Sequence, residues 1–108
     1  MRRAQRDILD YIRDPDYRLP AWPDDYWPAA DEEADPRAWK KTVAEFVRDR
    51  TALEKIAANP RTSLSAPLPH ARKHTFIREL AIVSEHNAYH IGEFAILRQV
   101  MGTWPAGR

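Results

Sequence analysis

Two histidines, His86 and His90, lie four positions apart in the stretch SEHNAYHIGE, residues 84–93. On a helix, residues at this spacing are neighbours on one face, with β-carbons about 5–6 Å apart. Two imidazoles placed in this way can bind one Zn²⁺ ion through nitrogens at about 2.0–2.1 Å. We therefore interpret His86 and His90 as candidate ligands of a divalent metal ion.

The pair alone does not make a complete metal site. A third ligand must come from elsewhere, and a catalytic ion also needs an open position for water. Position 87 is asparagine, so the motif lacks the adjacent glutamate of the zincin proteases. Glu79 and Glu93 lie on nearby turns and are candidate hydrogen-bond acceptors or ligands. The alternative is that both histidines are core residues hydrogen-bonded to main-chain or carboxylate oxygens.

The other histidines and the tryptophans, whose side chains could also bind a metal ion or a ligand, are predicted to be structural. His70 and His74 flank the basic turn HARKH, and we expect surface or capping roles for them. Four tryptophans are predicted to pack in the core rather than to line a ligand site. They are Trp22, Trp27, Trp39 and Trp104.

Hydrophobic periodicity predicts three helices that must position the histidine pair. The first covers residues 2–13 and ends before Pro15. The second begins with Asp35 as N-cap and Pro36 in the first turn, and runs to about residue 59. The third covers about residues 75–101, with Gly102 as its stop.

Each of the two longer predicted helices has an apolar stripe, and His86 and His90 fall on the same face as the second of these stripes. Gly92 predicts the close approach of a neighbouring helix or of a bound group. The stripes are Trp39, Val43, Phe46, Val47, Leu53 and Ile56, then Phe76, Leu80, Val83, Phe94, Leu97 and Met101.

Two proline-containing connections join the predicted helices. The first, residues 14–36, holds five of the nine prolines together with Tyr17, Trp22, Tyr26 and Trp27. Aromatic rings bury large areas when they meet a surface, so we expect this loop to pack across the helices and to cover a pocket. The second connection, residues 60–73, is predicted to be a loop.

Composition limits the function classes. Seventeen Lys and Arg against sixteen Asp and Glu give a net charge of +1, which argues against nucleic acid or an anionic membrane as partner. The chain has no cysteine, and no uncharged run approaches the roughly 18 residues of a membrane span. The N-terminal residues are charged throughout and do not form a signal peptide. We expect one cytoplasmic domain, residues 1–108.

The run TFIRELAIVSEHNAYHIGEFAILRQVMGTWP, residues 75–105, resembles the closing helix of the DinB-like superfamily, which includes the DinB and YfiT types. Residues 2–28 resemble the second helix of that family and the loop after it. The residues that carry the resemblance are Arg78, Glu79, His86, Asn87, Ala88, Tyr89, His90, Gly92, Glu93, Leu97, Arg98, Gly102 and Trp104.

The resemblance implies an all-α fold, an antiparallel four-helix bundle of which about three helices are present here. It also implies a homodimer and a divalent metal, zinc or nickel, held by three histidines, two of which fall on His86 and His90. Residues 1–40 contain no histidine, so the third ligand has no counterpart. We interpret the chain as a shortened form, from an internal start, or as a divergent member.

Two functions follow as hypotheses. The first is a DinB-like metal-dependent enzyme of hydrolase or thiol-transferase type, acting on a small molecule or with a thiol cosubstrate. The second is a non-catalytic helical dimerisation or interaction module with an incomplete metal site. Three helices would leave apolar faces uncovered, because each helix stripe needs a facing layer, and such faces favour self-association.

Overall fold

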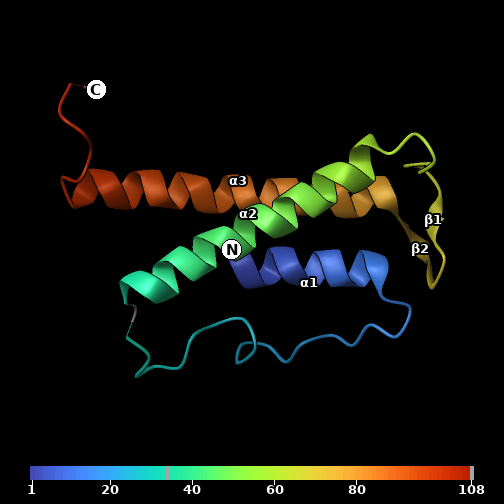
Figure 1. Ribbon diagram of the computed structural model, residues 1–108, viewed down its shortest axis with the longest axis horizontal. Helices are drawn as coiled ribbons and strands as arrows, with labels where there is room; N and C mark the ends of the chain where they lie inside the picture. Colours follow the sequence, from blue (N-terminus) through green and yellow to red (C-terminus); the bar gives the residue numbers. More distant parts are fainter. Residues whose placement is uncertain (34, 108) are drawn as a thin grey trace.

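The computed structural model describes residues 1–33 and 35–107. Helices α1 (Arg2–Arg13), α2 (Pro36–Ala58) and α3 (Phe76–Val100) are joined by a long loop and by a two-stranded sheet, β1 (Pro67–Leu68) and β2 (Ala71–Thr75). The loop after α1 runs back along that helix to the start of α2, and the sheet lies at one end of the molecule (Figure 1). Within the described part of the chain, no helix is long and apolar enough to cross a membrane.

The predicted helix ends are confirmed by their capping contacts. The Asp35 carboxylate accepts a hydrogen bond from the backbone N–H of Ala38 at 2.6 Å, which satisfies one of the free donors at the start of α2. Thr75 caps α3 in the same way, accepting from the N–H of Arg78 at 3.3 Å. Gly102 follows α3 with a φ of +63°, the left-handed conformation that favours glycine at a helix end.

The all-α expectation is wrong, because residues predicted as a loop form a small antiparallel sheet. β1 pairs with β2 in a register that brings Pro67 opposite Thr75 and Leu68 opposite Ala71, with an irregularity between the two pairs. The sheet is a β element in an otherwise helical fold. It contributes to the core, because Leu68 is fully buried. The fold is therefore mixed α/β rather than all-α.

The core lies where the three helices meet the sheet. Its buried residues are Leu9, Ile12, Leu53, Leu68 and Val83. Next to this core, hydrogen bonds of the Gln5 side chain also join the three helices. Gln5 is fully buried, donates to the backbone oxygen of Phe46 at 2.8 Å, and accepts from the Asn87 side chain at 2.8 Å. Gln5 therefore links α1 to both long helices.

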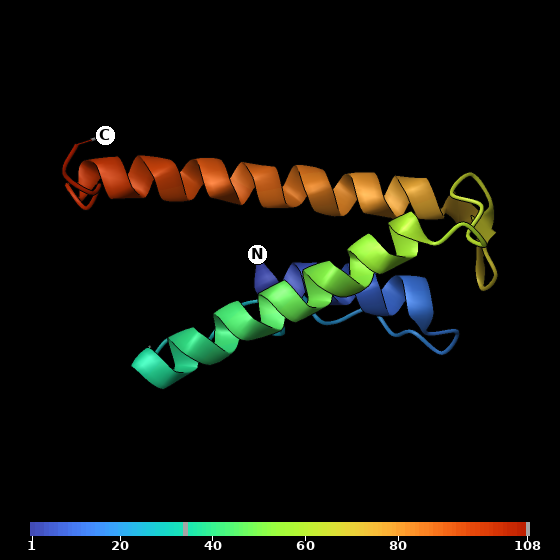
Figure 2. The same cartoon turned by 45° about the horizontal axis from the view of Figure 1, so that its top comes forward.

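Away from this core, α2 and α3 diverge, so that the first half of α2 and the second half of α3 do not cover each other (Figure 2). The apolar stripes continue into these halves but are exposed there, as expected for helices without a facing layer. The exposed fractions are 64% for Trp39, 42% for Val43, 41% for Val47, 47% for Phe94, 53% for Leu97 and 70% for Met101.

The predicted burial of the four tryptophans is wrong. Trp22, Trp27, Trp39 and Trp104 are all exposed, although Trp22 packs against Tyr26 and Trp104 lies under the Arg98 guanidinium. No neighbouring helix of the chain approaches Gly92 among the described residues, since a β-carbon at this position would meet nothing within 4 Å. The alternative, the approach of a bound group, stays a prediction.

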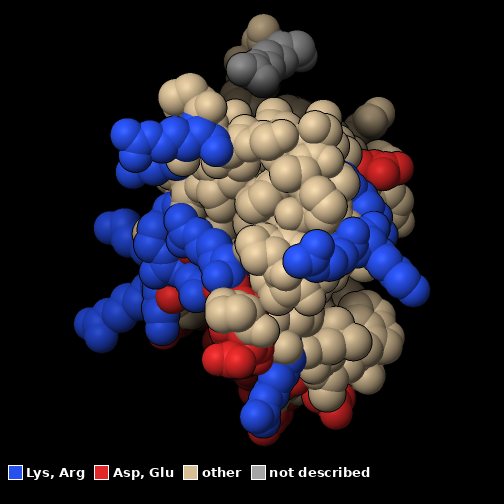
Figure 3. All heavy atoms as spheres, turned by 90° about the vertical axis from the view of Figure 1, so that its right-hand side faces the viewer, with Lys and Arg blue, Asp and Glu red and all other residues tan. Residues whose placement is uncertain are grey.

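Charged side chains of both signs surround an uncharged centre on the end of the molecule that carries the sheet (Figure 3). Lys and Arg lie along the sides of this face, and acidic side chains lie mainly along its lower edge. Such a mixed face fits the near-neutral net charge of +1.

Candidate metal centre

His86 and His90 lie one turn apart on α3, and their rings are in contact. The ring centroids are 4.5 Å apart with an interplanar angle of 67°. Both rings line a pocket of about 120 Å³ that α1 and the long loop complete. The other lining residues are Met1, Ala4, Trp22, Tyr26 and Trp27. The structure thus brings the two predicted ligands together at one small pocket.

His90 is oriented by a carboxylate on its own helix. Its Nδ1 lies 2.7 Å from Glu93 Oε2, three residues further along α3. This contact confirms the prediction that Glu93 accepts a hydrogen bond from an imidazole. Hydrogen bonds from Tyr89 and from His90 lower the pKa of Glu93, so this carboxylate is ionised and serves as an acceptor. With Nδ1 bound to Glu93, His90 has Nε2 left for a ligand.

His86 has a different environment. Its Nδ1 is buried without a hydrogen-bond partner among the described residues, as is Oδ1 of the adjacent Asn87. Burial, and secondly the neighbouring His90, lower the pKa of His86 below its ordinary value of 6.5, while Asn87 acts in the opposite direction. The ring is therefore held neutral, which is the form that binds metal ions.

These observations fit a divalent metal in part. An imidazole fixed by a carboxylate, as His90 is, is a feature of metal-binding histidines. Nδ1 of His86 has no hydrogen-bond partner among the described residues. However, the described residues contain no group of three or more His, Cys, Asp or Glu side chains that could hold a metal ion together. The protein side chains found here therefore supply two candidate ligands, His86 and His90.

Glu79, the other carboxylate predicted near the pair, belongs to a separate cluster at the sheet end of the molecule. It is buried, forms an ion pair with Arg78, and lies 3.7 Å from His74 Nδ1. His74 also shares a hydrogen bond of 2.7 Å with the Tyr11 hydroxyl, and His70 Nε2 lies 2.7 Å from the Tyr11 backbone oxygen. His70, in the turn between the strands, and His74, in β2, both contact α1, so their predicted structural role is confirmed. The predicted capping role is wrong, since Thr75 caps α3 and both histidines are partly buried.

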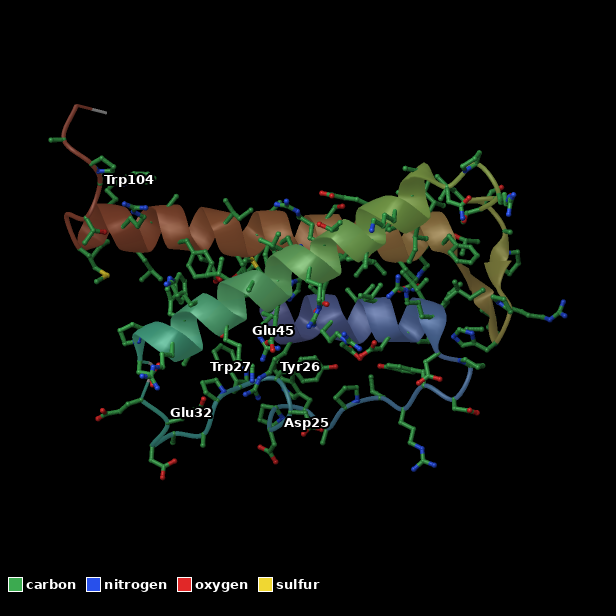
Figure 4. All side chains as sticks on the ribbon, viewed as in Figure 1. Asp25, Tyr26, Trp27, Glu32, Glu45 and Trp104 are labelled. Carbon is green, nitrogen blue, oxygen red and sulfur yellow. The ribbon has the colours of Figure 1, made fainter. Side chains whose placement is uncertain are left out.

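The long loop is fastened to α1 beside the pocket by one carboxylate and one guanidinium. Asp7 accepts hydrogen bonds from the Tyr17 hydroxyl at 2.7 Å and from the Tyr26 hydroxyl at 2.6 Å. Arg3 donates to the backbone oxygens of Asp25 at 3.2 Å and Trp27 at 2.6 Å. In Figure 4, Tyr26 and Trp27 lie between the loop and α1. The prediction that this loop is ordered and covers a pocket is confirmed, with its hydrogen bonds made to α1.

Sequence reasoning missed several of these residues. Arg3 and Asp7 carry no local signal, because their partners lie 10 to 24 positions away. Trp22 and Trp27 were expected in the core, although they line the pocket with 73% and 59% of their surface exposed. The concentration of aromatic residues in a proline-rich loop was the one sequence signal that pointed to this region.

Comparison with known proteins adds no relative: no family model, curated protein or solved structure matches this chain. The DinB-like resemblance stays a prediction that rests on the residues quoted above.

Proposed function

We propose that this protein binds a divalent metal ion, zinc or nickel, through His86 and His90, and acts in the cytoplasm as a DinB-like metal-dependent enzyme. The observation that carries the proposal is the position of both rings on one pocket, in contact at 4.5 Å, with His86 Nδ1 lacking a partner. The absence of cysteine in the sequence supports the cytoplasmic location.

The proposed reaction class is the one that the DinB-like resemblance implies. Two histidines leave positions for water, a thiol or a substrate, and the pocket provides room for them. Bound there, a divalent ion supplies Lewis acidity that lowers the pKa of a coordinated water or thiol. Glu93 keeps His90 in the tautomer that presents Nε2, and burial keeps His86 neutral. Hydrolysis or thiol transfer on a small molecule is the proposed reaction type.

The proposal is tested by titrating untagged, metal-free protein with Zn²⁺ and Ni²⁺ in a calorimeter. The double variant His86→Ala/His90→Ala is expected to lose the binding of one ion per chain. His70→Ala/His74→Ala is the matched control, since it removes two histidines at the same spacing from the sheet region. We expect this control to bind metal as the wild type does, provided that circular dichroism shows both variants folded.

Two results would remove the metal-site proposal. One is wild-type protein that binds neither ion. The other is equal binding by wild type and by the His86→Ala/His90→Ala variant, which would place the ion elsewhere on the chain.

A second function, a dimerisation module, is favoured by the exposed apolar halves of α2 and α3. We propose a second copy of this chain as the occupant of this surface, which comprises Trp39, Val43, Val47, Phe94, Leu97 and Met101. These side chains are 41% to 70% exposed, and apolar surface of this kind marks sites of protein–protein contact. A homodimer is compatible with the metal site as well as with a non-catalytic role.

A further inference from the structure

The pocket at the histidine pair has walls of unusual composition. Three of its lining residues, Trp22, Tyr26 and Trp27, come from the long loop, and Ala4 comes from α1. Among the described residues that line it, none has an acidic or basic side chain apart from the two imidazoles. Trp22 and Trp27 are 73% and 59% exposed, so their rings have contact surface left for a ligand.

The charged side chains nearest to this aromatic wall are already engaged. Both oxygens of Asp7 accept hydrogen bonds, one from Tyr17 and one from Tyr26. Arg3 is bound to backbone oxygens on either side of Tyr26, and Glu93 is bound to His90. The α-amino group of Met1 also belongs to the lining, and burial lowers its pKa from 8.0. Aromatic and aliphatic side chains otherwise form the wall beside the two imidazoles, so the wall offers a ligand mainly apolar contact surface.

We propose that this pocket binds a small aromatic ring, about the size of benzene, between the loop aromatics and the two histidines. The inference rests on the proposed function, because the ring would be the part of the substrate that lies next to the reacting group. Asp7 and Arg3 are positioning residues in this scheme, since they hold Trp22, Tyr26 and Trp27 over the histidine pair without lining the pocket.

The size of the pocket supports this ligand class. Its volume of about 120 Å³ is close to that of an apolar protein cavity of about 150 Å³ that binds benzene. Aromatic rings pack against one another at centroid distances of about 4.5–7 Å, and Trp22 and Tyr26 already have this relation at 5.5 Å. A ring can therefore stack within the wall that these residues form.

The test compares benzamide with acetamide, which share the amide group and differ in the ring. Binding to metal-free protein in the presence of chelator would be followed by NMR on the indole N–H signals of Trp22 and Trp27. We expect benzamide to bind at least tenfold more tightly than acetamide. Trp22→Ala should weaken benzamide binding at least fivefold, whereas Trp104→Ala should leave it unchanged, since Trp104 lies at the far end of α3 (Figure 4).

The role of the loop contacts is tested in the same assay. Asp7→Asn should weaken benzamide binding, because an amide cannot accept hydrogen bonds from both tyrosines through two oxygens. Asp10→Asn is the matched control on the same helix, since Asp10 pairs with Arg6 and not with the loop. Acetamide binding as tightly as benzamide, or no benzamide binding at all, would overturn the inference, as would equal effects of the two substitutions.

The outcome is separable from that of the metal proposal. Asp7→Asn leaves His86, His90 and Glu93 intact, so its Zn²⁺ affinity should remain within threefold of wild type. Metal binding without benzamide binding would refute the ring pocket alone. Benzamide binding without metal binding would refute the metal site and leave the ring pocket standing.

Discussion

Glu93 determines which nitrogen of His90 is available to a ligand. Its carboxylate lies 2.7 Å from Nδ1, so Nε2 is the nitrogen that remains. A carboxylate that accepts from a metal-binding histidine also makes the imidazole a better electron donor. The spacing of three residues on one helix creates this pairing, which is why the contact could be predicted from the sequence.

A prediction at this scale concerns Glu93→Gln. The amide would accept a weaker hydrogen bond and add no negative charge, so we expect the Zn²⁺ affinity to fall by about 10-fold to 100-fold. Calorimetric titration of the metal-free variant measures this change. Glu85→Gln is the control, because Glu85 is an exposed acidic residue of the same helix. Equal affinities for the Glu93 and Glu85 variants would show that the contact with His90 has no part in metal binding.

At the scale of elements, the long loop owes its position to the Asp7 carboxylate. Burial, and then the hydrogen bond to Asp7, raise the pKa of Tyr26 from 10.0 to about 12. Because the pKa of the folded state exceeds that of the unfolded state, the contribution to stability is fully present below pH 10. It is lost as the pH rises from 10 to about 12.

This shift gives a prediction for alkaline titration. The ring signals of Tyr26, followed by NMR, should titrate with a midpoint near 12 in wild type, and the midpoint should move toward 10 in Asp7→Asn. Asp10→Asn should leave the midpoint where it is, since Asp10 pairs with Arg6. A Tyr26 midpoint near 10 in wild-type protein would mean that the phenol is not held by Asp7 in solution.

The elements also show what local sequence can predict. Asp35-Pro36 and Thr75 mark helix starts because capping depends on a few neighbouring residues. The sheet escaped prediction because β1 has two residues, one of them a proline, and because the five residues of β2, ARKHT, lack an alternating apolar pattern. Its formation depends on pairing between the two segments and on the burial of Leu68, neither of which is a local property.

For the whole molecule, the main feature is that apolar surface continues past the core. The apolar stripes of α2 and α3 are buried near the sheet, where α1 packs against both helices. They are exposed where α2 and α3 diverge. Periodicity predicts which residues share a face, but it does not say what covers that face. This is why Leu53 and Val83 are buried as expected while Val43 and Leu97, on the same stripes, are not.

The proposed dimer gives a prediction at this scale. Leu97→Asp should convert a dimer into a monomer, because a carboxylate would then be buried between two apolar surfaces. Ile77→Asp is a closely matched control on α3, since Ile77 is 54% exposed and Leu97 is 53% exposed. Size-exclusion chromatography with light scattering measures the mass of each. A monomeric wild type, or equal dissociation by both variants, would contradict the dimer.

The central claim is that His86 and His90 share one metal ion. Zinc X-ray absorption spectroscopy on untagged protein loaded with one equivalent of Zn²⁺ tests it most directly, because the spectrum counts imidazole ligands. We predict a fit with two imidazole nitrogens at about 2.0–2.1 Å and with O or N donors from other groups completing the coordination. This imidazole signature should disappear in His86→Ala/His90→Ala. A wild-type spectrum without imidazole ligands, or one that the double substitution leaves unchanged, would contradict the account.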